Sequence, residues 1–394
     1  MNSKRHLLIL LLIFSLASHL EAKVKNGIIP GLLQTDLYFP LLKGKVIGVV
    51  TNQTSVIGRV HLVDSLKSAG FSVKNVFAPE HGFRGDKGAG ESVPNQIDQR
   101  TGLPVISLYG NHVRPESKDL KGIEVMIFDI QDVGVRFYTY LSTLQYVMEA
   151  CAENNIALIV LDRPNPNGFY IDGPVLESEY SSFVGLQPVP VVYGMTIGEY
   201  ASMLNGEGWL KNKMKCNLKI VPLKNYNRNL ISQLLRPPSP NLPDMDAILL
   251  YPSLCFFEGT KISVGRGTNK PFRLIGYPQK SIDGISFTPE NIPGVAANPP
   301  YQDTLCVGRD LTGEGRNFAE SKKIQLKLLI EMYSQYPEKE KFFSSFFDKL
   351  AGTAKLRKQI IENKSEEEIR KSWEVGINHF KEIRKKYLKY EDFK

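Results

Sequence analysis

The amino-acid sequence predicts an α/β protein with a mostly parallel β-sheet, followed by a second region of different character. In the first half of the chain, short continuous apolar runs alternate with helical patterns, as is typical of a parallel sheet covered by helices on both faces. Beyond residue 190 such runs become sparse, and from Phe318 onward the pattern is mostly helical. The 394 residues suffice for two domains. We therefore expect a sheet domain over 23–190 and an α+β domain over 191–394.

The first 22 residues have the pattern of a secretory signal peptide. Lys4 and Arg5 precede an almost wholly apolar run over 7–17, which is short for a bilayer span, and cleavage is expected after Ala22. A membrane anchor is the alternative. No later stretch is apolar enough to cross a membrane, so we expect an exported protein, periplasmic or secreted, without membrane attachment after signal removal.

The charge of the chain is mildly basic. Lys4, Arg5 and Glu21 leave with the signal, which lowers the formal net charge by one, from +8 to +7. The basic residues crowd into 355–394, where glutamates are mixed among them, as on solvated helix faces. No zinc-finger or other nucleic-acid motif accompanies them, so we expect no nucleic-acid partner. An anionic cell-wall polymer is compatible with export.

Five apolar runs predict the strands of the sheet, at 46–51 (VIGVVT), 73–78, 105–109, 125–130 and 156–161. A helix is expected after the first run, with Val60, Val63 and Leu66 on one face and Gly70 as its C-terminal stop. A second helix is expected over 140–153, where apolar residues recur at helical spacing.

The second half contains fewer clear elements. The stretch 195–206 predicts a helix, whereas 218–221 and 247–250 predict strands. The segment 236–243 (RPPSPNLP) must be irregular or extended, because its prolines lack N–H donors.

Cysteines and glycines exclude several chemistries. Cys151, Cys216, Cys255 and Cys306 form no CxxC pair, and we expect buried free thiols rather than a metal site. The glycine-rich GDKGAG and GRG segments match neither GxGxxG nor the Walker motif, so no nucleotide cofactor is expected. The absence of GxSxG disfavours a serine esterase.

Polar side chains follow four of the five expected strands at the point where each strand ends. Ligands of open α/β sheets bind outside these carboxyl ends, so we expect the side chains to line one polar cleft. The residues are Asn52 after the first strand, Glu80, His81 and Arg84 after the second, Asp129, Asp132 and Arg136 at the fourth, and Asp162, Arg163 and Asn165 after the fifth.

Three carboxylates are candidates for acid–base chemistry. Glu80 follows an apolar VFAP stretch, and a carboxyl group against apolar walls is suited to act as a general acid. Glu91 lies eleven residues further on, and Glu258 lies in FFEGTKISVGRGT. Glycoside cleavage commonly uses two carboxyl groups. The alternative for Glu80 is a salt bridge to Arg84 or Arg136.

Several arginines lie in segments punctuated by glycine or proline, namely Arg136, Arg163, Arg266 and Arg273. A guanidinium can hold a carboxylate through two parallel hydrogen bonds, so each is a candidate for binding an acidic substrate. Structural ion pairs are the alternative.

A dozen motifs in this order resemble a known family: VVTNQTS, FAPEHGFRG, GAGE, TGLPVISLYG, FDIQDVGVRFYTYLST, LDRPNPNG, DGPVL, GMTIGEYA, NGEGWL, PPSPNLP, YPSLCFFEGTKISVGRGT and PF. The chain is similar to the exo-β-N-acetylmuramidases of peptidoglycan recycling from about Gly44 to about Tyr277, and more weakly to its end. The resemblance implies a Rossmann-like domain joined to a smaller auxiliary domain, with the active site in the cleft between them. It implies a glycosidase that releases N-acetylmuramic acid from the non-reducing end of peptidoglycan fragments.

The resemblance also implies roles for individual residues. Glu80 in PEHG and Glu91 in AGE are expected to be the catalytic carboxylates, and Glu258 and Arg266 to contact the sugar. The lactyl carboxylate of N-acetylmuramic acid could be recognised by Arg136, Arg163 or Arg266. The expected partners are peptidoglycan-derived muramyl saccharides, without metal or organic cofactor. A periplasmic sugar-binding protein without catalysis and a carbohydrate deacetylase or esterase are the alternatives.

Overall fold

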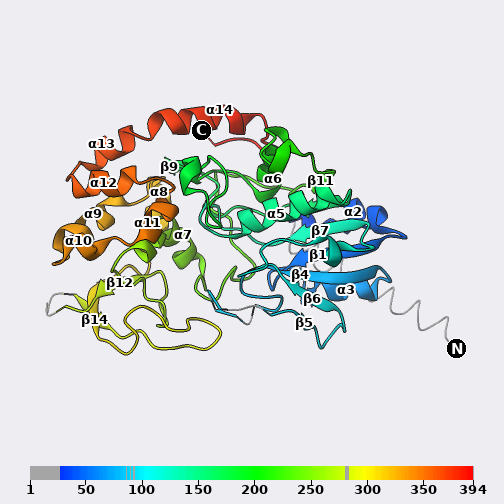
Figure 1. Ribbon diagram of the computed structural model, residues 1–394, viewed down its shortest axis with the longest axis horizontal. Helices are drawn as coiled ribbons and strands as arrows, with labels where there is room; N and C mark the ends of the chain where they lie inside the picture. Colours follow the sequence, from blue (N-terminus) through cyan, green and yellow to red (C-terminus); the bar gives the residue numbers. More distant parts are fainter. Residues whose placement is uncertain (1–26, 86, 89, 92–93, 280–283, 394) are drawn as a thin grey trace.

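The structure is a computed structural model that describes residues 27–393 except 86, 89, 92–93 and 280–283 (Figure 1). The expected signal peptide, 1–22, lies outside the described residues. Within the described part of the chain, no helix has the length and apolar character needed to cross a membrane.

A seven-stranded sheet forms the centre of the first domain, in the order β11-β8-β7-β1-β4-β6-β5. Six strands are parallel, and only β5 at the edge is antiparallel. The bounds are β1 Val46–Thr51, β4 Ser72–Ala78, β5 Gln96–Ile97, β6 Pro104–Ser107, β7 Val125–Asp129, β8 Ala157–Leu161 and β11 Leu218–Val221. The chain adds strands outward on one side of β1 and then on the other, which is the Rossmann strand order.

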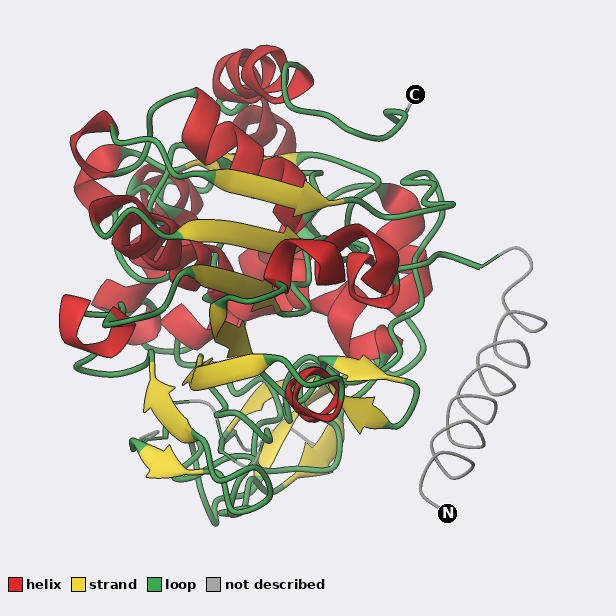
Figure 2. Ribbon diagram, turned by 90° about the vertical axis from the view of Figure 1, so that its right-hand side faces the viewer, coloured by secondary structure: helices red, strands yellow, loops and turns green. Residues whose placement is uncertain are grey.

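Helices cover both faces of this sheet (Figure 2). Alternate strand residues point to opposite faces, so Val49 packs into one core cluster and Val50 into the other. The first cluster includes side chains of α2 (Thr35–Leu42) and α3 (Leu62–Ser68), and the second those of α5 (Tyr140–Glu153) and α6 (Ile197–Gly206). This two-sided burial explains why the strands read as continuous apolar runs.

Shorter elements complete this domain. They are the helix α4 (Ser117–Leu120), the 3-10 helices η1 (Gly31–Leu33), η2 (Ser178–Tyr180) and η3 (Lys211–Lys213), and the strand pairs β2 (Val56–Ile57) with β3 (Val60–His61) and β9 (Asp172–Val175) with β10 (Pro190–Val192).

The C-terminal domain is mainly helical and carries one small antiparallel sheet (Figure 1). The sheet has the order β12-β14-β13, with bounds Leu274–Tyr277, Cys306–Asp310 and Ile285–Phe287. The helical elements are α7 Met245–Leu254, η4 Cys255–Gly259, α8 Gly315–Ser321, α9 Leu326–Gln335, α10 Lys339–Phe342, α11 Ser345–Ala351, α12 Lys355–Ile361, α13 Glu366–Lys371 and α14 Glu374–Lys385.

Most sequence-predicted elements are confirmed. The strands at 46–51 and 218–221 and the helix at 140–153 have the predicted bounds. As predicted, the first helix ends before Gly70, which has φ +83°, but it begins at Leu62, and Val60, predicted on its apolar face, lies exposed in β3. The four cysteines are free and buried. The strand predicted at 247–250 is wrong, because these residues belong to α7, whose N-cap Asp244 accepts a hydrogen bond from the Ala247 N–H. A helix buried on all sides shows the same unbroken apolar run as a buried strand.

The sheet continues past the expected domain boundary near residue 190. Its edge strand β11 pairs in parallel with β8, and the C-terminal domain begins with α7 at Met245. The boundary near residue 190 was predicted where clear apolar periodicity ends in the sequence. The pairing of β11 with β8 extends the sheet domain beyond that point and depends on tertiary structure.

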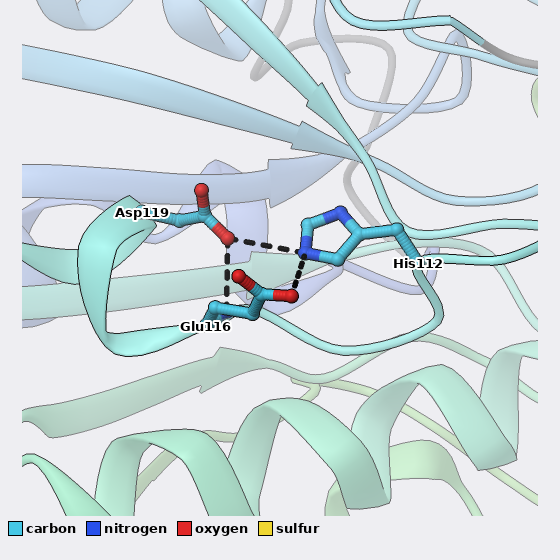
Figure 3. A group of neighbouring side chains, drawn as sticks. All are labelled: His112, Glu116 and Asp119. Carbon is cyan, nitrogen blue, oxygen red and sulfur yellow. Dashed lines mark hydrogen bonds and ion pairs between the residues drawn. The ribbon is translucent and has the colours of Figure 1, made fainter.

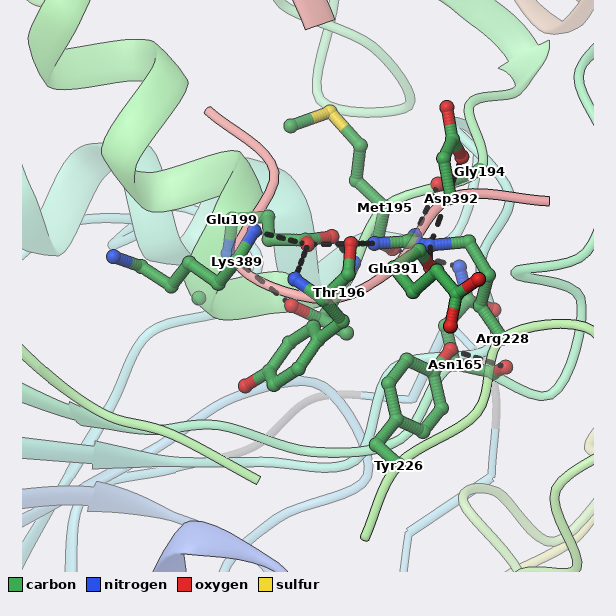
Figure 4. Close-up of polar contacts among 12 residues, drawn as sticks. Asn165, Gly194, Met195, Thr196, Glu199, Tyr226, Arg228, Lys389, Glu391 and Asp392 are labelled. Carbon is green, nitrogen blue, oxygen red and sulfur yellow. Dashed lines mark hydrogen bonds and ion pairs between the residues drawn. The ribbon is translucent and has the colours of Figure 1, made fainter. Parts of the chain in front are cut away.

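The C-terminal end returns to the sheet domain and is fastened there by buried charges (Figure 4). Arg228 and Glu199 form an ion pair with 2.6 Å between Nη2 and Oε1, and both side chains are completely buried. The backbone N–H of Lys389 donates to the same Glu199 oxygen at 2.8 Å, and Arg228 Nε donates to the Glu391 carbonyl at 2.9 Å. Segment 389–391 is therefore tied by hydrogen bonds to buried charges of the sheet domain, although its own residues are exposed or half-buried.

Candidate active site

A cavity of about 280 Å³ lies where the carboxyl ends of the sheet strands meet the C-terminal domain. Glu80 and His81 reach it from the loop after β4, Tyr109 from the loop after β6, and Thr139 from the residue before α5. The C-terminal domain contributes Glu258 from η4, Arg266 from the loop that follows, and Phe346 from α11. Of the predicted site residues, the structure brings together Glu80, His81, Glu258 and Arg266.

Polar donors hold the carboxylate of Glu80. The Thr139 hydroxyl donates to Oε2 at 2.8 Å, and the Gly90 N–H donates to Oε1 at 3.2 Å. The Tyr109 hydroxyl also bonds to Glu80, and burial, with the charge of Glu80 as a further cause, raises the pKa of Tyr109, so it stays a neutral donor. These donors replace the apolar walls expected from the sequence. Arg84 does not pair with Glu80.

His81 lines the cavity as a neutral imidazole in a strained backbone conformation. Its φ of +73° is unusual for a residue other than glycine, and such strain is concentrated at functional sites. Nδ1 lies 3.0 Å from the Lys87 carbonyl, which can only accept, so Nδ1 carries the proton and Nε2 keeps its lone pair. Burial lowers the pKa of His81, against the opposing effect of the Glu80 charge.

Glu258 and Arg266 form an ion pair that faces the same cavity. The distance between Arg266 Nε and Glu258 Oε1 is 2.6 Å, and the two side chains are 18% and 22% exposed. The guanidinium lies over the ring of Phe272, with Cζ 4.9 Å from the ring centroid. The second Glu258 oxygen is 3.5 Å from the Cys255 thiol.

Packed aromatic rings form much of the cavity wall. Tyr251 packs edge to face against Phe272 and Tyr138, with centroids 4.8 and 5.9 Å apart. Tyr138 in turn packs against Tyr140 at 4.7 Å. The cavity thus combines rigid aromatic surface with a few convergent polar groups, as small-molecule sites usually do.

Asn52 lies at the switch point of the strand order and bonds within the protein. Its Nδ2 donates to the Tyr140 hydroxyl at 3.0 Å, and its Oδ1 accepts from the Thr54 hydroxyl at 2.6 Å. The Thr54 hydroxyl accepts from the Gln131 N–H at 3.2 Å. Asn52 is fully buried and does not line the cavity, so the expectation that it binds substrate is corrected.

Asp129 and Arg163 form a buried pair instead of contacting a substrate in this cavity. Arg163 Nε and Nη2 donate to the two Asp129 oxygens at 2.7 and 2.6 Å, which ties the ends of β7 and β8 together. Arg163 borders a different cavity of about 560 Å³, which residues 27–33 help to enclose. Neither Asp129 nor Arg163 lines the cavity around Glu80, so the prediction that they bind substrate there is corrected.

Arg136 is sealed inside the protein and cannot hold a substrate carboxylate. Its Nη1 donates to the carbonyls of Pro174 and Val189, and its Nη2 to those of Leu350 and Ala351, at 2.7–2.9 Å. The side chain is 1% exposed. Because Leu350 and Ala351 end helix α11, Arg136 joins the two domains. The four carbonyls bind the Nη1 and Nη2 donors that were predicted to hold a substrate carboxylate.

Asp132 and Asn165 shape two facing loops. Tyr193 Oη donates to Asp132 Oδ2 at 2.5 Å, and burial raises the Asp132 pKa to about 6. Asn165 Nδ2 donates to the Met195 carbonyl at 2.8 Å, and a Cβ on Gly134 would lie 1.9 Å from Asn165 Oδ1. Neither side chain lines the cavity, so both are positioning residues of the fold rather than the substrate contacts expected.

Asp162 and Arg84 also have partners elsewhere. Asp162 accepts hydrogen bonds from the Thr196 hydroxyl and the Gly198 N–H, both at 2.8 Å, and burial raises its pKa to about 6. Arg84 donates to both oxygens of Asp98 at 3.2 and 2.9 Å. These contacts correct the expectation that the two side chains face a substrate.

Glu91 lines a neighbouring cavity of about 580 Å³, which shares Tyr109 with the first. The two carboxylates predicted to be catalytic therefore lie on cavities that meet at Tyr109. The Glu91 charge is one of those acting on His81, so the two residues are close enough to interact.

The second cavity also holds a group that could accept a cation, formed by His112, Glu116 and Asp119 (Figure 3). One ligand atom of each lies within 4.8 Å of the others. Each side chain has another local role, since Asp119 accepts from the Glu116 N–H at 2.9 Å, Glu116 pairs with Lys118 at 2.6 Å, and His112 Nδ1 lies 2.8 Å from the Ser107 carbonyl. The cap of α4 accounts for the positions of Glu116 and Asp119.

The sequence reasoning missed Thr139 and Tyr109 as partners of Glu80. Thr139 directly precedes the predicted helix at 140, and Tyr109 ends the third predicted strand. Both were therefore at the expected sheet edge, and the polar-residue criterion could have selected the hydroxyl of each.

Comparisons with known proteins agree over nearly the whole chain. Family models described as exo-beta-N-acetylmuramidase NamZ match residues 47–246 (N-terminal) and 249–390 (C-terminal), changing over near the start of α7. The peptidoglycan beta-N-acetylmuramidase NamZ of Bacillus subtilis (strain 168) is 41% identical over 388 residues, covering 94% of this chain and 92% of that protein.

Two crystal structures of DUF1343 family proteins from Bacteroides fragilis have similar folds. One is 45% identical, with a TM-score of 0.86 and coverage of 93% of this chain and 99% of that chain. The other is 30% identical, with a TM-score of 0.74 and coverage of 93% and 100%.

Proposed function

Because the chain belongs to the NamZ family of exo-β-N-acetylmuramidases, we propose that it is a glycosidase that releases N-acetylmuramic acid from the non-reducing end of peptidoglycan fragments. The observation that carries the assignment to a site is the convergence of Glu80, Glu258 and Arg266 on one aromatic-walled cavity of about 280 Å³. A space of this size suits a single sugar unit, which is the unit an exo-acting enzyme removes.

In this proposal Glu80 is the general acid and base. It protonates the glycosidic oxygen as the bond from that oxygen to the anomeric carbon breaks, and water supplies the hydroxyl that the anomeric carbon gains. Thr139 and Gly90 support this role because they hold the two carboxylate oxygens in place. Glu91, across Tyr109, is the second catalytic carboxylate, and Glu258 with Arg266 contacts the sugar.

We further propose that the protein is exported and works in the periplasm or outside the cell. The basic residues, apolar run and small residues of 1–22 support this location, and so does a substrate that belongs to the cell wall.

The test is incubation of the full processed chain with a defined muramyl–glucosaminyl disaccharide, with products identified by mass and by anomer. Free N-acetylmuramic acid is the expected product. A disaccharide that has lost only an acetyl group would instead indicate a deacetylase. Saturable binding with an unchanged disaccharide would indicate a sugar-binding protein.

A further inference from the structure

The cavity around Glu80 contains one fixed positive charge among its described lining residues, that of Arg266. Glu80 and Glu258 supply carboxylates, and burial favours the neutral form of His81 because it lowers its pKa. An anionic substituent on a sugar bound here would therefore find one residue with the matching charge.

The hydrogen bond of Arg266 to Glu258 uses Nε, and neither amino group has a partner among the described residues. Its Nε is taken by Glu258, and one face of the guanidinium is covered by Phe272. Nη1 is closed to solvent and makes no hydrogen bond to the residues that the structure describes. The planar guanidinium directs the N–H bonds of its amino groups away from Nε–H, so the amino groups can bind a second acceptor while Glu258 stays in place.

Three arginines that are more deeply buried than Arg266 use both amino groups. Arg136 donates from Nη1 and Nη2 to four carbonyls, and Arg384 donates from both to Asp392. Arg228 donates from Nη1 to Gly194 and from Nη2 to Glu199. Leaving a buried donor unsatisfied is unfavourable. Arg136 Nε is also unpaired, and what distinguishes Arg266 is that its unpaired nitrogen belongs to a side chain that lines the cavity.

The turn that carries Arg266 is rigid. Gly265 and Gly267 have φ of +74° and +79°, and a Cβ on them would lie 2.8 Å from the Lys270 carbonyl oxygen and 2.5 Å from that of Glu290. The Thr268 hydroxyl closes the turn with a 2.7 Å bond to the Gly265 carbonyl. Arg266 is thus held in position before any ligand arrives, which reduces the entropy lost on binding.

We propose that the guanidinium of Arg266, which lines the cavity, binds the lactyl carboxylate of N-acetylmuramic acid, and that Arg266 is the residue that selects muramic acid over N-acetylglucosamine. This inference rests on the proposed function and adds to it a specificity-determining residue. N-acetylglucosamine lacks the lactyl group and leaves Nη1 unpaired. Sites that bury a group for one substrate reject the analogue that cannot pair with it. Of the three arginines that the sequence offered for this role, Arg136 and Arg163 have other partners.

The experiment compares three chromogenic β-glycosides: that of N-acetylmuramic acid, that of its lactyl N-methylamide, and that of N-acetylglucosamine. The methylamide keeps the shape of the lactyl group but removes its charge. We expect the wild type to prefer the acid over the methylamide by about a hundredfold in kcat/KM, as for a buried charged contact. R266Q should reduce this preference to a few-fold. R309Q, on the exposed face of β14, is the matched control and should keep it.

Arg266 also neutralises Glu258, so R266Q can lose activity towards all three glycosides. Binding of free N-acetylmuramic acid and of its methylamide, measured by calorimetry on the folded variants, then decides. R266K keeps a positive charge beside Glu258 but lacks the forked donors, and it should also lose the preference. A preference that survives in R266Q overturns the inference, as does a wild type that binds acid and amide equally. Absence of hydrolysis by a wild type that still prefers the acid contradicts the proposed function instead.

Discussion

The hydroxyl of Tyr390 donates a 2.6 Å hydrogen bond to the carboxylate of Asp162, although 228 residues separate them in sequence. The same hydroxyl accepts from the Leu223 N–H at 2.7 Å, beside the sheet edge strand β11. Asp162 lies directly after β8, where the strand-end rule predicts a ligand contact. In this protein Tyr390 of the C-terminal segment binds the Asp162 carboxylate at that position, so the carboxylate stabilises the fold.

Y390F should lower the free energy of unfolding by about 1–3 kcal/mol, because the buried Asp162 oxygen and the Leu223 N–H lose their partner. The KM for a muramic acid glycoside should not change, since Asp162 does not line the cavity. Urea denaturation and steady-state kinetics on the same preparation check the two statements. A raised KM with unchanged stability would return Asp162 to the substrate site.

E80Q should lower kcat on a chromogenic muramic acid glycoside by about a hundredfold or more, the range of general acid–base catalysis. The amide has the shape of the carboxyl group but cannot exchange the proton. D119N, a carboxylate on the neighbouring cavity that does not contact Glu80, is the matched control and should retain near wild-type kcat. Equal activity of E80Q and wild type would remove Glu80 from the mechanism.

T139V should lower kcat by about tenfold while leaving the protein folded, because the Thr139 hydroxyl fixes one oxygen of Glu80 at 2.8 Å. T139S restores a hydroxyl at the same position and should recover most of the rate. Kinetics of the two variants, with circular dichroism for folding, test the positioning role. If T139S lost as much activity as T139V, the hydroxyl would not be what Glu80 requires, and the positioning role would be contradicted.

R228M should destabilise the fold by about 3–5 kcal/mol, because it leaves the fully buried Glu199 carboxylate without its ion partner. The double variant E199Q/R228M removes both charges and should regain part of the loss. Denaturation midpoints of the wild type, the single variant and the double variant measure the difference. If the double variant is no more stable than R228M, uncompensated charge is not the cause.

The stability contributed by Asp132 should depend on pH. Burial raises its pKa from 3.8 to about 6, so the protonated form is favoured by folding. Its contribution is complete below the unfolded-state pKa and is lost as the pH rises through about 6. D132N stays neutral, so its free energy of unfolding should rise relative to that of the wild type between about pH 4 and about pH 7, by at most about 3 kcal/mol. Urea titrations of both proteins across this range test the sign, and a constant difference would contradict it.

Particular residues show how far the sequence could predict the site. Glu80 and Glu258 were found because each carboxylate stands at the junction of an apolar run and a glycine-containing segment. Asp129 and Arg163 satisfied the strand-end criterion, as Glu80 also did, and yet form a pair with each other. A strand end places a side chain at the sheet edge, but the identity of its partner depends on which other segment reaches that edge.

The sequence by itself determined where the main strands and helices of the sheet domain follow one another along the chain. Strands buried on both faces require continuous apolar runs, and caps and glycines mark where helices end. Tertiary structure decided which polar residues remain free. Arg136 is occupied by the end of α11 and Asp162 by Tyr390, each from more than 200 residues away, whereas Nη1 of Arg266 has no hydrogen-bond partner in the described part of the chain. Hydrogen bonds over such separations have no local signature, because they depend on how the two domains pack together.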